Sequence, residues 1–247
     1  MRMNQTPLIL GHRGVPGEAP ENTLAGFELA MASGADGIEL DVHLSRDGEL
    51  VVIHDDTLDR TTDGSGPVGA YSLRELKRFN AAARFAGRFQ PQPIPTLAEV
   101  VEAVGDSAFI NIEIKSGTTQ YPGIERKVAD FILARGIGAR VVVSSFNHHA
   151  LMELKRIAPE IPVGLLYVAA LIGPWSYAER VGADALHPLH YTVCPRMVEK
   201  AHERGLQVNP WTVNSEKHIR RMLAAGVDAI ITNVPALAVQ IARGDSE

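Results

Sequence analysis

The sequence predicts an α/β fold built as a parallel barrel, and three observations support this prediction. Short apolar runs alternate with helical stretches along most of the 247 residues, and such alternation indicates a parallel sheet. A unit of helix, glycine and short strand recurs in the second half as GARVVV, GADALH, GLQVNP and GVDAII. The chain is also long enough for the eight units of a TIM (β/α)8 barrel, which needs ~250 residues.

The first of these observations rests on nine strand-like runs. They are Leu8–Leu10, Gly37–Leu44, Leu50–His54, Phe109–Lys115, Arg140–Phe146, Val163–Tyr167, Ala185–His187, Gln207–Trp211 and Ala229–Thr232. No helix separates the second run from the third, and the Asp-Gly pair at 47–48 is a strong hairpin signal. We therefore expect the third run to return antiparallel, which leaves eight strands for the barrel. With 47–48 as the turn, Asp41 would lie opposite His54.

Helical patterns lie between most of the strand-like runs. The clearest are Thr23–Ser33, Leu97–Val104, Ile124–Ala134, His148–Ile157, Arg196–Arg204, Glu216–Ala225 and Ala236–Ala242. Glycine follows five of them, where helices commonly end. A doubly wound open sheet is the alternative fold, but no GxGxxG motif follows the first strand to favour it.

The interval from Asp56 to Pro95 breaks this rhythm. It is too long for a barrel loop of ~2–6 residues, and it contains a short helical pattern near Leu73–Phe79. We expect an inserted subdomain at about 56–95, within a single domain that spans 1–247. A plain surface excursion is the alternative, but the position directly after His54 supports a lid beside the candidate site equally well.

Composition excludes several classes of protein. Hydrophobic residues make up 45% and charged residues 21% of the chain, as in ordinary globular proteins rather than disordered ones. The net charge of −5 argues against nucleic acid as a partner, because phosphate-binding surfaces are usually basic. The single cysteine, Cys194, excludes an internal disulfide framework and a CxxC metal site, and we expect it at the start of a helix.

No targeting or membrane-spanning segment is evident. The apolar run near the amino terminus extends from Pro7 to Leu10 only, whereas a signal peptide needs ~7–15 apolar residues. No run approaches the ~18 apolar residues of a membrane span. We therefore expect a soluble, cytoplasmic protein with no stable membrane insertion. The sequence carries no indication of the oligomeric state.

The polar faces of two strands carry the residues best suited to chemistry. Period-two alternation places Glu39 and Asp41 on one face of the second run, and Glu113 on the corresponding face of the fourth. These faces should point into the barrel mouth, where barrel enzymes build their active sites. Buried carboxylates need a neutralising cation, and their oxygens suit Mg²⁺ or Ca²⁺, with Mn²⁺ also possible. We predict one such ion. The alternative is that Arg13 and Lys115 neutralise the carboxylates.

Two histidines accompany the carboxylates. His12 ends the first strand and His54 ends the returning strand. A lone histidine would more often be a core or surface residue, but two beside a carboxylate cluster indicate a general acid and a general base. Arg13 and Lys115 add cations at the same rim. Cations together with a divalent metal suit a phosphoryl group, whose oxygens gain charge during reaction.

Several short motifs also stand in a characteristic order. They are His12-Arg13-Gly14, Pro20-Glu21-Asn22-Thr23, Glu39-x-Asp41, Asp47-Gly48-x-x-Val51, His54-Asp55, Glu113-x-Lys115, Ser144-Ser145-Phe146 and Trp211-Thr212-Val213-Asn214. Each is weak alone, but in this order they resemble the glycerophosphodiester phosphodiesterase family, from about Ile9 to Pro235. The insertion after His54 resembles the small extra subdomain of that family, and the chain length and the lack of a signal peptide resemble its short bacterial cytosolic branch.

The resemblance implies a metal-dependent barrel hydrolase that cleaves glycerophosphodiesters to sn-glycerol 3-phosphate and an alcohol. It implies that His12 and His54 are the acid–base pair. It also implies that the metal ligands are Glu39, Asp41 and Glu113.

The resemblance assigns substrate contacts as well. Arg13 and Lys115 resemble phosphate contacts. Phe146 and Trp211 resemble apolar contacts to the glycerol, although aromatic residues at strand ends are often plain core. His187 stands in a position similar to that of a family histidine, near the rim. We interpret His190 as a surface residue and leave His43 without a role, although its face points inward.

Two mechanisms and two other protein classes stay open. We favour attack on phosphorus by the neighbouring glycerol hydroxyl, with water then opening a cyclic phosphate; direct attack by metal-bound water is the alternative. A related phospholipase, either phospholipase D-like or phosphoinositide-cleaving, would need a membrane-docking segment, and only the apolar run at 167–177 offers one. A non-catalytic binding barrel would not need two histidines for proton transfer.

Overall fold

The computed structural model describes residues 6–85, 87–115 and 121–244, and in it the chain forms the expected α/β barrel. The strands are β1 (Leu8–His12), β2 (Gly37–Leu44), β3 (Leu50–Val52), β4 (Phe109–Ile114), β5 (Val141–Ser145), β6 (Val163–Tyr167), β7 (Ala185–Pro188), β8 (Gln207–Val208) and β9 (Ala229–Thr232). All except β3 run parallel, in the order β8–β7–β6–β5–β4–β2–β1–β9.

Backbone hydrogen bonds between the two ends of this order close the barrel. The Asp228 amide donates to the Val208 carbonyl over 2.9 Å, and the Ile231 amide donates to the Pro210 carbonyl over 3.0 Å. The predicted eight-strand barrel is therefore confirmed.

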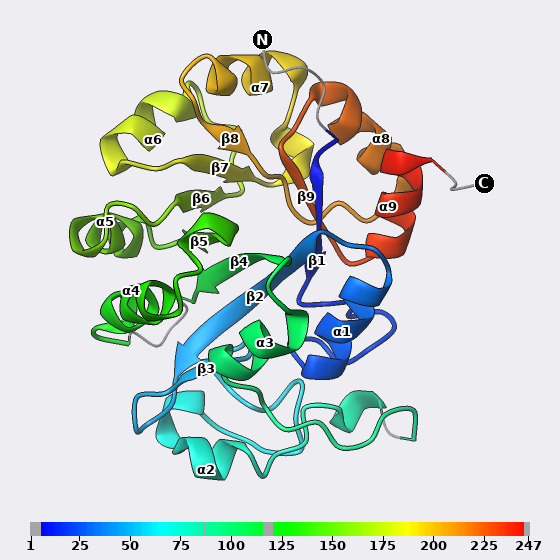
Figure 1. Ribbon diagram of the computed structural model, residues 1–247, viewed down its shortest axis with the longest axis vertical. Helices are drawn as coiled ribbons and strands as arrows, with labels where there is room; N and C mark the ends of the chain where they lie inside the picture. Colours follow the sequence, from blue (N-terminus) through cyan, green and yellow to red (C-terminus); the bar gives the residue numbers. More distant parts are fainter. Residues whose placement is uncertain (1–5, 86, 116–120, 245–247) are drawn as a thin grey trace.

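Helices surround the barrel on the outside (Figure 1). They are α1 (Leu24–Ala32), α3 (Leu97–Val104), α4 (Ile124–Arg135), α5 (His148–Ile157), α6 (Pro174–Val181), α7 (Pro195–His202), α8 (Glu216–Ala225) and α9 (Pro235–Arg243). Helix α2 (Leu73–Leu76) lies apart from this ring, in the segment after β3 (Figure 1). The short 3₁₀ turns are η1 (Val68–Ala70), η2 (Ala83–Phe85), η3 (Gly138–Arg140) and η4 (His190–Thr192). Among the described residues, no helix combines the length and the apolar character needed to cross a bilayer. Cys194 caps the start of α7, as expected.

Helix α6 was not among the expected helices. The Gly173-Pro174 pair resembles a loop signal, but here it starts the helix. Gly173 is the N-cap in a left-handed conformation, and Pro174 is the first helical residue. Proline is tolerated there because the first amides of a helix have no intrahelical partner.

The hairpin between β2 and β3 has the expected antiparallel direction, but the predicted register is wrong by one residue. His43 pairs with Val51 and Val42 with Val52. The loop holds the three residues 46–48, because the Ser45 amide donates to the Glu49 carbonyl. Gly48 takes φ +82°, which suits a three-residue loop ending in a left-handed residue.

The corrected register moves the partner of Asp41. The Ile53 amide donates to the Asp41 carbonyl over 3.1 Å, so Asp41 lies opposite Ile53 rather than His54. His54 lies beyond the end of β3 and reaches the site from the segment that follows the strand.

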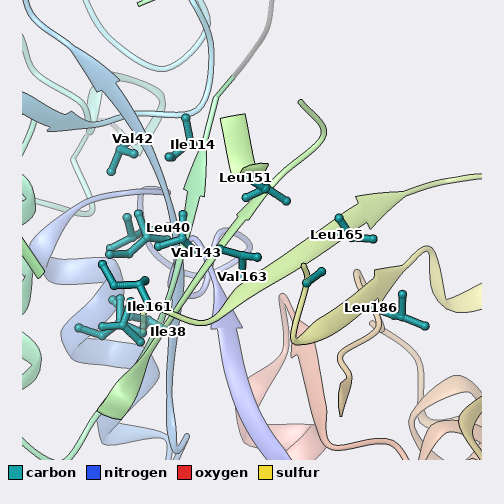
Figure 2. Packing of buried hydrophobic residues seen from close by; sticks show 14 of the residues in the cluster. Ile38, Leu40, Val42, Ile114, Val143, Leu151, Ile161, Val163, Leu165 and Leu186 are labelled. Carbon is teal, nitrogen blue, oxygen red and sulfur yellow. The ribbon is translucent and has the colours of Figure 1, made fainter. Parts of the chain in front are cut away.

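The two faces of the central strands follow the predicted alternation. Ile38, Leu40 and Val42 of β2 are fully buried with Ile110, Ile112 and Ile114 of β4, in the core between sheet and helices. Figure 2 shows part of this layer, to which Val143, Val163 and Leu165 of the next strands contribute. Because this outer layer is apolar, the opposite face of the same strands points its polar residues into the barrel.

Residues 56–85 and 87–95 lie below β2 and β3 in Figure 1, beside the main barrel. This segment packs on β3 through a second buried apolar cluster of Val51, Ile53, Leu58, Val68, Leu76 and Ile94. Helix α2 is shorter than the expected pattern. It begins with a capping box in which Ser72 and Glu75 bind each other's backbone amides, an arrangement that stabilises a helix start.

Candidate active site

The turn after β1 is built from His12, Arg13 and Gly14. Arg13 takes the left-handed φ of 54°, and Gly14 takes φ +88°. A Cβ atom on Gly14 would lie 2.6 Å from the backbone of Gly26 in α1. Glycine is therefore required for the chain to turn this closely against the helix. The turn directs the side chains of His12 and Arg13 toward β2, where His12 is in register with Glu39.

Three carboxylates converge beside this turn. One oxygen each from Glu39, Asp41 and Glu113 lie within 4.8 Å of one another; Glu39 and Asp41 are buried, and the Glu113 side chain is 11% exposed. Burial and the neighbouring Asp41 raise the pKa of Glu113 to about 7 and that of Glu39 well above its usual value. If all three carboxyl groups were ionised, their charge would exceed that of the two neighbouring cations by one, and the raised pKa values are the consequence of crowding these groups together. A hard divalent cation fits this donor set.

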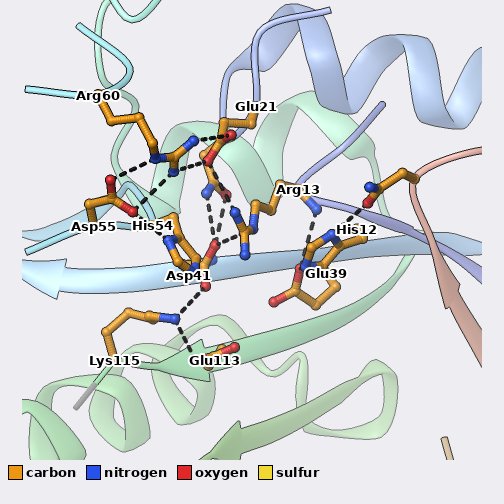
Figure 3. Close-up of polar contacts among 12 residues, drawn as sticks. His12, Arg13, Glu21, Glu39, Asp41, His54, Asp55, Arg60, Glu113 and Lys115 are labelled. Carbon is orange, nitrogen blue, oxygen red and sulfur yellow. Dashed lines mark hydrogen bonds and ion pairs between the residues drawn. The ribbon is translucent and has the colours of Figure 1, made fainter. Parts of the chain in front are cut away.

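Two cations already contact the cluster. Lys115 Nζ lies 2.7 Å from Glu113 Oε1 and 3.3 Å from Asp41 Oδ1, and Arg13 Nε lies 3.3 Å from Asp41 Oδ2 (Figure 3). Burial acts to raise the pKa of Asp41, but Lys115 and Arg13 hold it below its usual value. Both roles considered for these cations, charge neutralisation and phosphate contact, are compatible with this position at the rim.

The two histidines are oriented in the same way. His12 Nδ1 lies 2.6 Å from Asn233 Oδ1, and His54 Nδ1 lies 2.6 Å from Asp55 Oδ1. Both partner oxygens can only accept, so each ring holds a proton on Nδ1 and presents Nε2 for chemistry. Burial lowers both pKa values, that of His12 to about 4. The lowered pKa values favour the neutral form of each ring, in which Nε2 can accept a proton.

Asn22 also belongs to the site, and sequence reasoning quoted it only within a motif. Its side-chain amide donates to Asp41 Oδ2 over 2.8 Å, and its own backbone has φ 54°. Asparagine tolerates this left-handed conformation better than most residues. Asn233 was missed altogether, because nothing in its local sequence indicates contact with a histidine 221 positions earlier.

The aromatic residues Phe146 and Trp211 meet edge to face at the rim. Their ring centroids are 5.4 Å apart with an interplanar angle of 87°. Phe146 is 43% exposed, and Trp211 Nε1 donates to the His187 carbonyl over 2.8 Å. The pair thus offers an apolar surface beside the polar site.

Two expectations about other histidines are wrong. His187 is fully buried inside the barrel rather than at the rim, and burial lowers its pKa to about 3. It fills the space above Gly164, where a Cβ atom would lie 2.3 Å from its Nε2. His190, which was expected at the surface, is also buried, with Nε2 3.3 Å from His218 Nδ1.

His43 has a definite structural position, although the sequence assigned it no role. Its ring is fully buried. Nε2 lies 3.1 Å from the His54 carbonyl oxygen and therefore donates to it, while Nδ1 accepts from the Tyr121 hydroxyl over 3.1 Å. His43 thus holds the backbone of His54 in place through this hydrogen bond.

The apolar run at 167–177 forms the segment after β6 and the start of α6. Val168 is 58% exposed and Ile172 is wholly exposed. This part of the chain therefore presents apolar side chains to solvent.

The fold and the site together define a class: an α/β-barrel hydrolase whose mouth is equipped for a phosphoric ester. Residues 12–237 match the Glycerophosphoryl diester phosphodiesterase family. The chain belongs to this glycerophosphodiester phosphodiesterase family, and the enzyme class predicted from its motifs is confirmed.

Relatives cover nearly the whole chain. A glycerophosphodiester phosphodiesterase of Caldanaerobacter subterraneus is 47% identical over 237 residues, which cover 96% of this chain and 98% of the relative. One from Bacillus altitudinis is 44% identical, with 94% and 97% covered. A phosphodiesterase of Oleispira antarctica, solved in complex with the product sn-glycerol-3-phosphate, has a TM-score of 0.86 and 31% identity, with 96% of each chain covered. The structure of a glycerophosphodiester phosphodiesterase from Agrobacterium tumefaciens has a TM-score of 0.83 and 31% identity, and the match covers 94% of this chain and 98% of that one.

Proposed function

We propose that this protein hydrolyses glycerophosphodiesters to sn-glycerol 3-phosphate and an alcohol, with the aid of one divalent cation, Mg²⁺, Ca²⁺ or Mn²⁺. The observation that carries the proposal is the meeting of a carboxylate cluster with two histidines and two cations at one end of the barrel. Family membership, and the product bound to the Oleispira relative, support the same substrate class. The proposal treats 1–247 as one catalytic domain with 56–95 as an inserted subdomain.

The cation would be held by Glu39, Asp41 and Glu113. When bound, it supplies positive charge that neutralises the carboxylates and polarises the phosphoryl oxygens. Arg13 and Lys115 bind the non-bridging oxygens of the same phosphate. These two side chains therefore orient the diester before any bond breaks.

The two histidines move the protons. One histidine, neutral at Nε2, takes the proton of the neighbouring glycerol hydroxyl, which attacks phosphorus and forms a cyclic phosphate. The other histidine must enter this step protonated on both ring nitrogens, and it gives its Nε2 proton to the alcohol oxygen as the bond from phosphorus to that oxygen breaks. In the second stage the roles reverse, and a water molecule opens the ring to give the phosphomonoester. His12 and His54 are suited to this exchange because their Nδ1 protons are held by acceptors that never donate. Direct attack by water is the alternative.

The test is hydrolysis of glycerophosphocholine and glycerophosphoethanolamine after treatment with a chelator, with Mg²⁺, Ca²⁺ or Mn²⁺ returned singly. We expect sn-glycerol 3-phosphate to be released only when a metal is returned. The variant Glu113→Gln should respond weakly to metal, whereas the control Glu102→Gln, which removes an exposed carboxylate of α3 paired with Arg135, should behave as the wild type. Full activity after chelation would refute the metal site.

The exposed apolar segment at 167–177 favours one second candidate, a phospholipase that accepts a lipid-linked phosphodiester. A lysophospholipid added to the same assay separates the two functions. Faster release of the headgroup alcohol from the lysophospholipid than from glycerophosphocholine would favour the phospholipase. Release from neither substrate would favour a non-catalytic binding barrel.

A further inference from the structure

Arg60 occupies the centre of an ion-pair network at the edge of the site. It stands in the segment 56–95, just after the site histidine. Its guanidinium donates to Asp55 from Nε over 2.7 Å and from Nη2 over 3.0 Å. It also donates to Glu21 from Nη1 over 2.8 Å and from Nη2 over 2.7 Å. One arginine therefore binds two carboxylates, each through two hydrogen bonds (Figure 3).

Each of these carboxylates in turn holds one site residue. Asp55 Oδ1 accepts from His54 Nδ1 over 2.6 Å, and Glu21 Oε1 accepts from Arg13 Nη1 over 3.2 Å. A continuous chain of contacts therefore joins His54, the proposed proton-transfer residue, to Arg13, the proposed phosphate contact. Within this chain of contacts, Arg60 is the residue that joins Asp55 to Glu21. It thereby connects segment 56–95 to the loop after β1.

We propose that Arg60 is a positioning residue for catalysis, which holds His54 through Asp55 and Arg13 through Glu21. The inference rests on the proposed function, because it assumes that these two residues act on the substrate. Only a planar guanidinium with several fixed donors can bind two carboxylates in this way. The side chain is 49% exposed, so it contributes little to the core. Its role is to hold the carboxylates of Asp55 and Glu21 in place at the same time.

The experiment compares Arg60→Ala with Arg46→Ala as a matched control. Arg46 is a similarly exposed arginine that also joins segment 56–95 to the barrel, since it pairs with Glu75 over 2.8 Å and donates to the Ala70 carbonyl. It contacts no site residue. We expect Arg60→Ala to lower kcat/KM by at least ~10-fold, because small misplacements of reacting groups cost up to ~10²-fold. Arg46→Ala should stay near the wild type.

Three further measurements separate positioning from a purely structural role. Added guanidinium, well below denaturing concentration, should partly restore Arg60→Ala, whereas the same ionic strength of NaCl should not. Arg60→Lys should stay impaired, because an ammonium cannot bind both carboxylates bidentately. Asp55→Asn should mainly lower kcat and Glu21→Gln mainly raise KM, while Arg60→Ala does both. Melting temperatures are measured for every variant, and activity is compared at a temperature at which all are folded.

The outcomes distinguish this inference from the proposed function. If His54→Asn and Arg13→Met lose activity but Arg60→Ala keeps wild-type kcat and KM, the positioning role is refuted and the proposed function stands. If Arg60→Lys is fully active, or guanidinium restores nothing, the doubly bidentate role is likewise refuted. If His54→Asn and Arg13→Met are themselves fully active, the proposed assignments fail first.

Discussion

Replacement of His54 by asparagine tests the proposed chemistry most directly. The His54 side chain is 28% exposed, and its Nδ1 atom contacts Asp55. An asparagine amide can donate to the same carboxylate, so the contact that anchors the side chain is retained. What the change removes is Nε2, the atom that would exchange a proton with substrate.

The magnitudes of the two effects differ widely. Even complete loss of this partly exposed polar contact would cost about 1 kcal/mol or less, which corresponds to about 2–4 °C in melting temperature for a chain of this size. Loss of a general acid or base costs ~10²–10⁴ in rate, which raises the activation barrier by about 3–5 kcal/mol. His54→Asn should therefore fold nearly normally and lose almost all turnover.

The assay measures kcat with glycerophosphocholine, the melting temperature, and Mn²⁺ binding by calorimetry. His149→Asn, which changes an exposed histidine of α5, is the matched control and should be unchanged in all three. His12→Asn should behave like His54→Asn, and the double variant should lose far less than the product of the two single losses, because the residues act in one proton-transfer sequence. Near wild-type turnover by His54→Asn would remove this residue from the mechanism.

Three other predictions concern the metal, the nucleophile and stability. Glu113→Gln should weaken Mg²⁺ or Mn²⁺ binding at least ~10-fold in calorimetry, and unchanged affinity would exclude Glu113 as a ligand. A substrate analogue without the glycerol 2-hydroxyl should resist hydrolysis, whereas rapid cleavage would leave only direct attack by water. His187 binds protons less readily when folded, with a pKa of about 3, than when unfolded, near 6.5. Protonation of His187 in the unfolded state should therefore lower the free energy of unfolding of the wild type by about 2 kcal/mol between pH 7 and pH 5. Urea titrations of His187→Asn should lack this loss. An equal pH dependence of stability in both proteins would contradict the argument from burial.

Much of the fold and part of the site follow from local sequence. The alternation in Ile38–Val42 and Ile110–Ile114 predicts which face of each strand packs on helices, because neighbouring side chains of a strand point to opposite sides whatever the rest of the chain does. The same period places Glu39, Asp41 and Glu113 inside the barrel. Parallel neighbours in a closed barrel then bring these side chains together, so the carboxylate cluster was predictable.

Other features depend on the conformation of a single loop or on burial. The hairpin register differs from the prediction because Gly48 takes a left-handed conformation in a three-residue loop, and a two-residue loop would satisfy the same sequence. His187 and His190 are buried because neighbouring strands and helices cover them, and histidine itself carries no clear preference for the surface or the interior.

The chain's own sequence thus determined the faces of its strands, the barrel, and the residue types at its mouth, because these depend on periods of two and of 3.6 residues that local backbone geometry imposes. Only the tertiary structure decided which atoms of those residues meet. Asn233 contacts His12 across 221 positions, and Arg60 bridges to Glu21 across 39. Such partners meet only when the barrel closes and brings the ends of distant strands to the same mouth. A local pattern of side chains along a strand or helix contains no information about which distant residues will meet there.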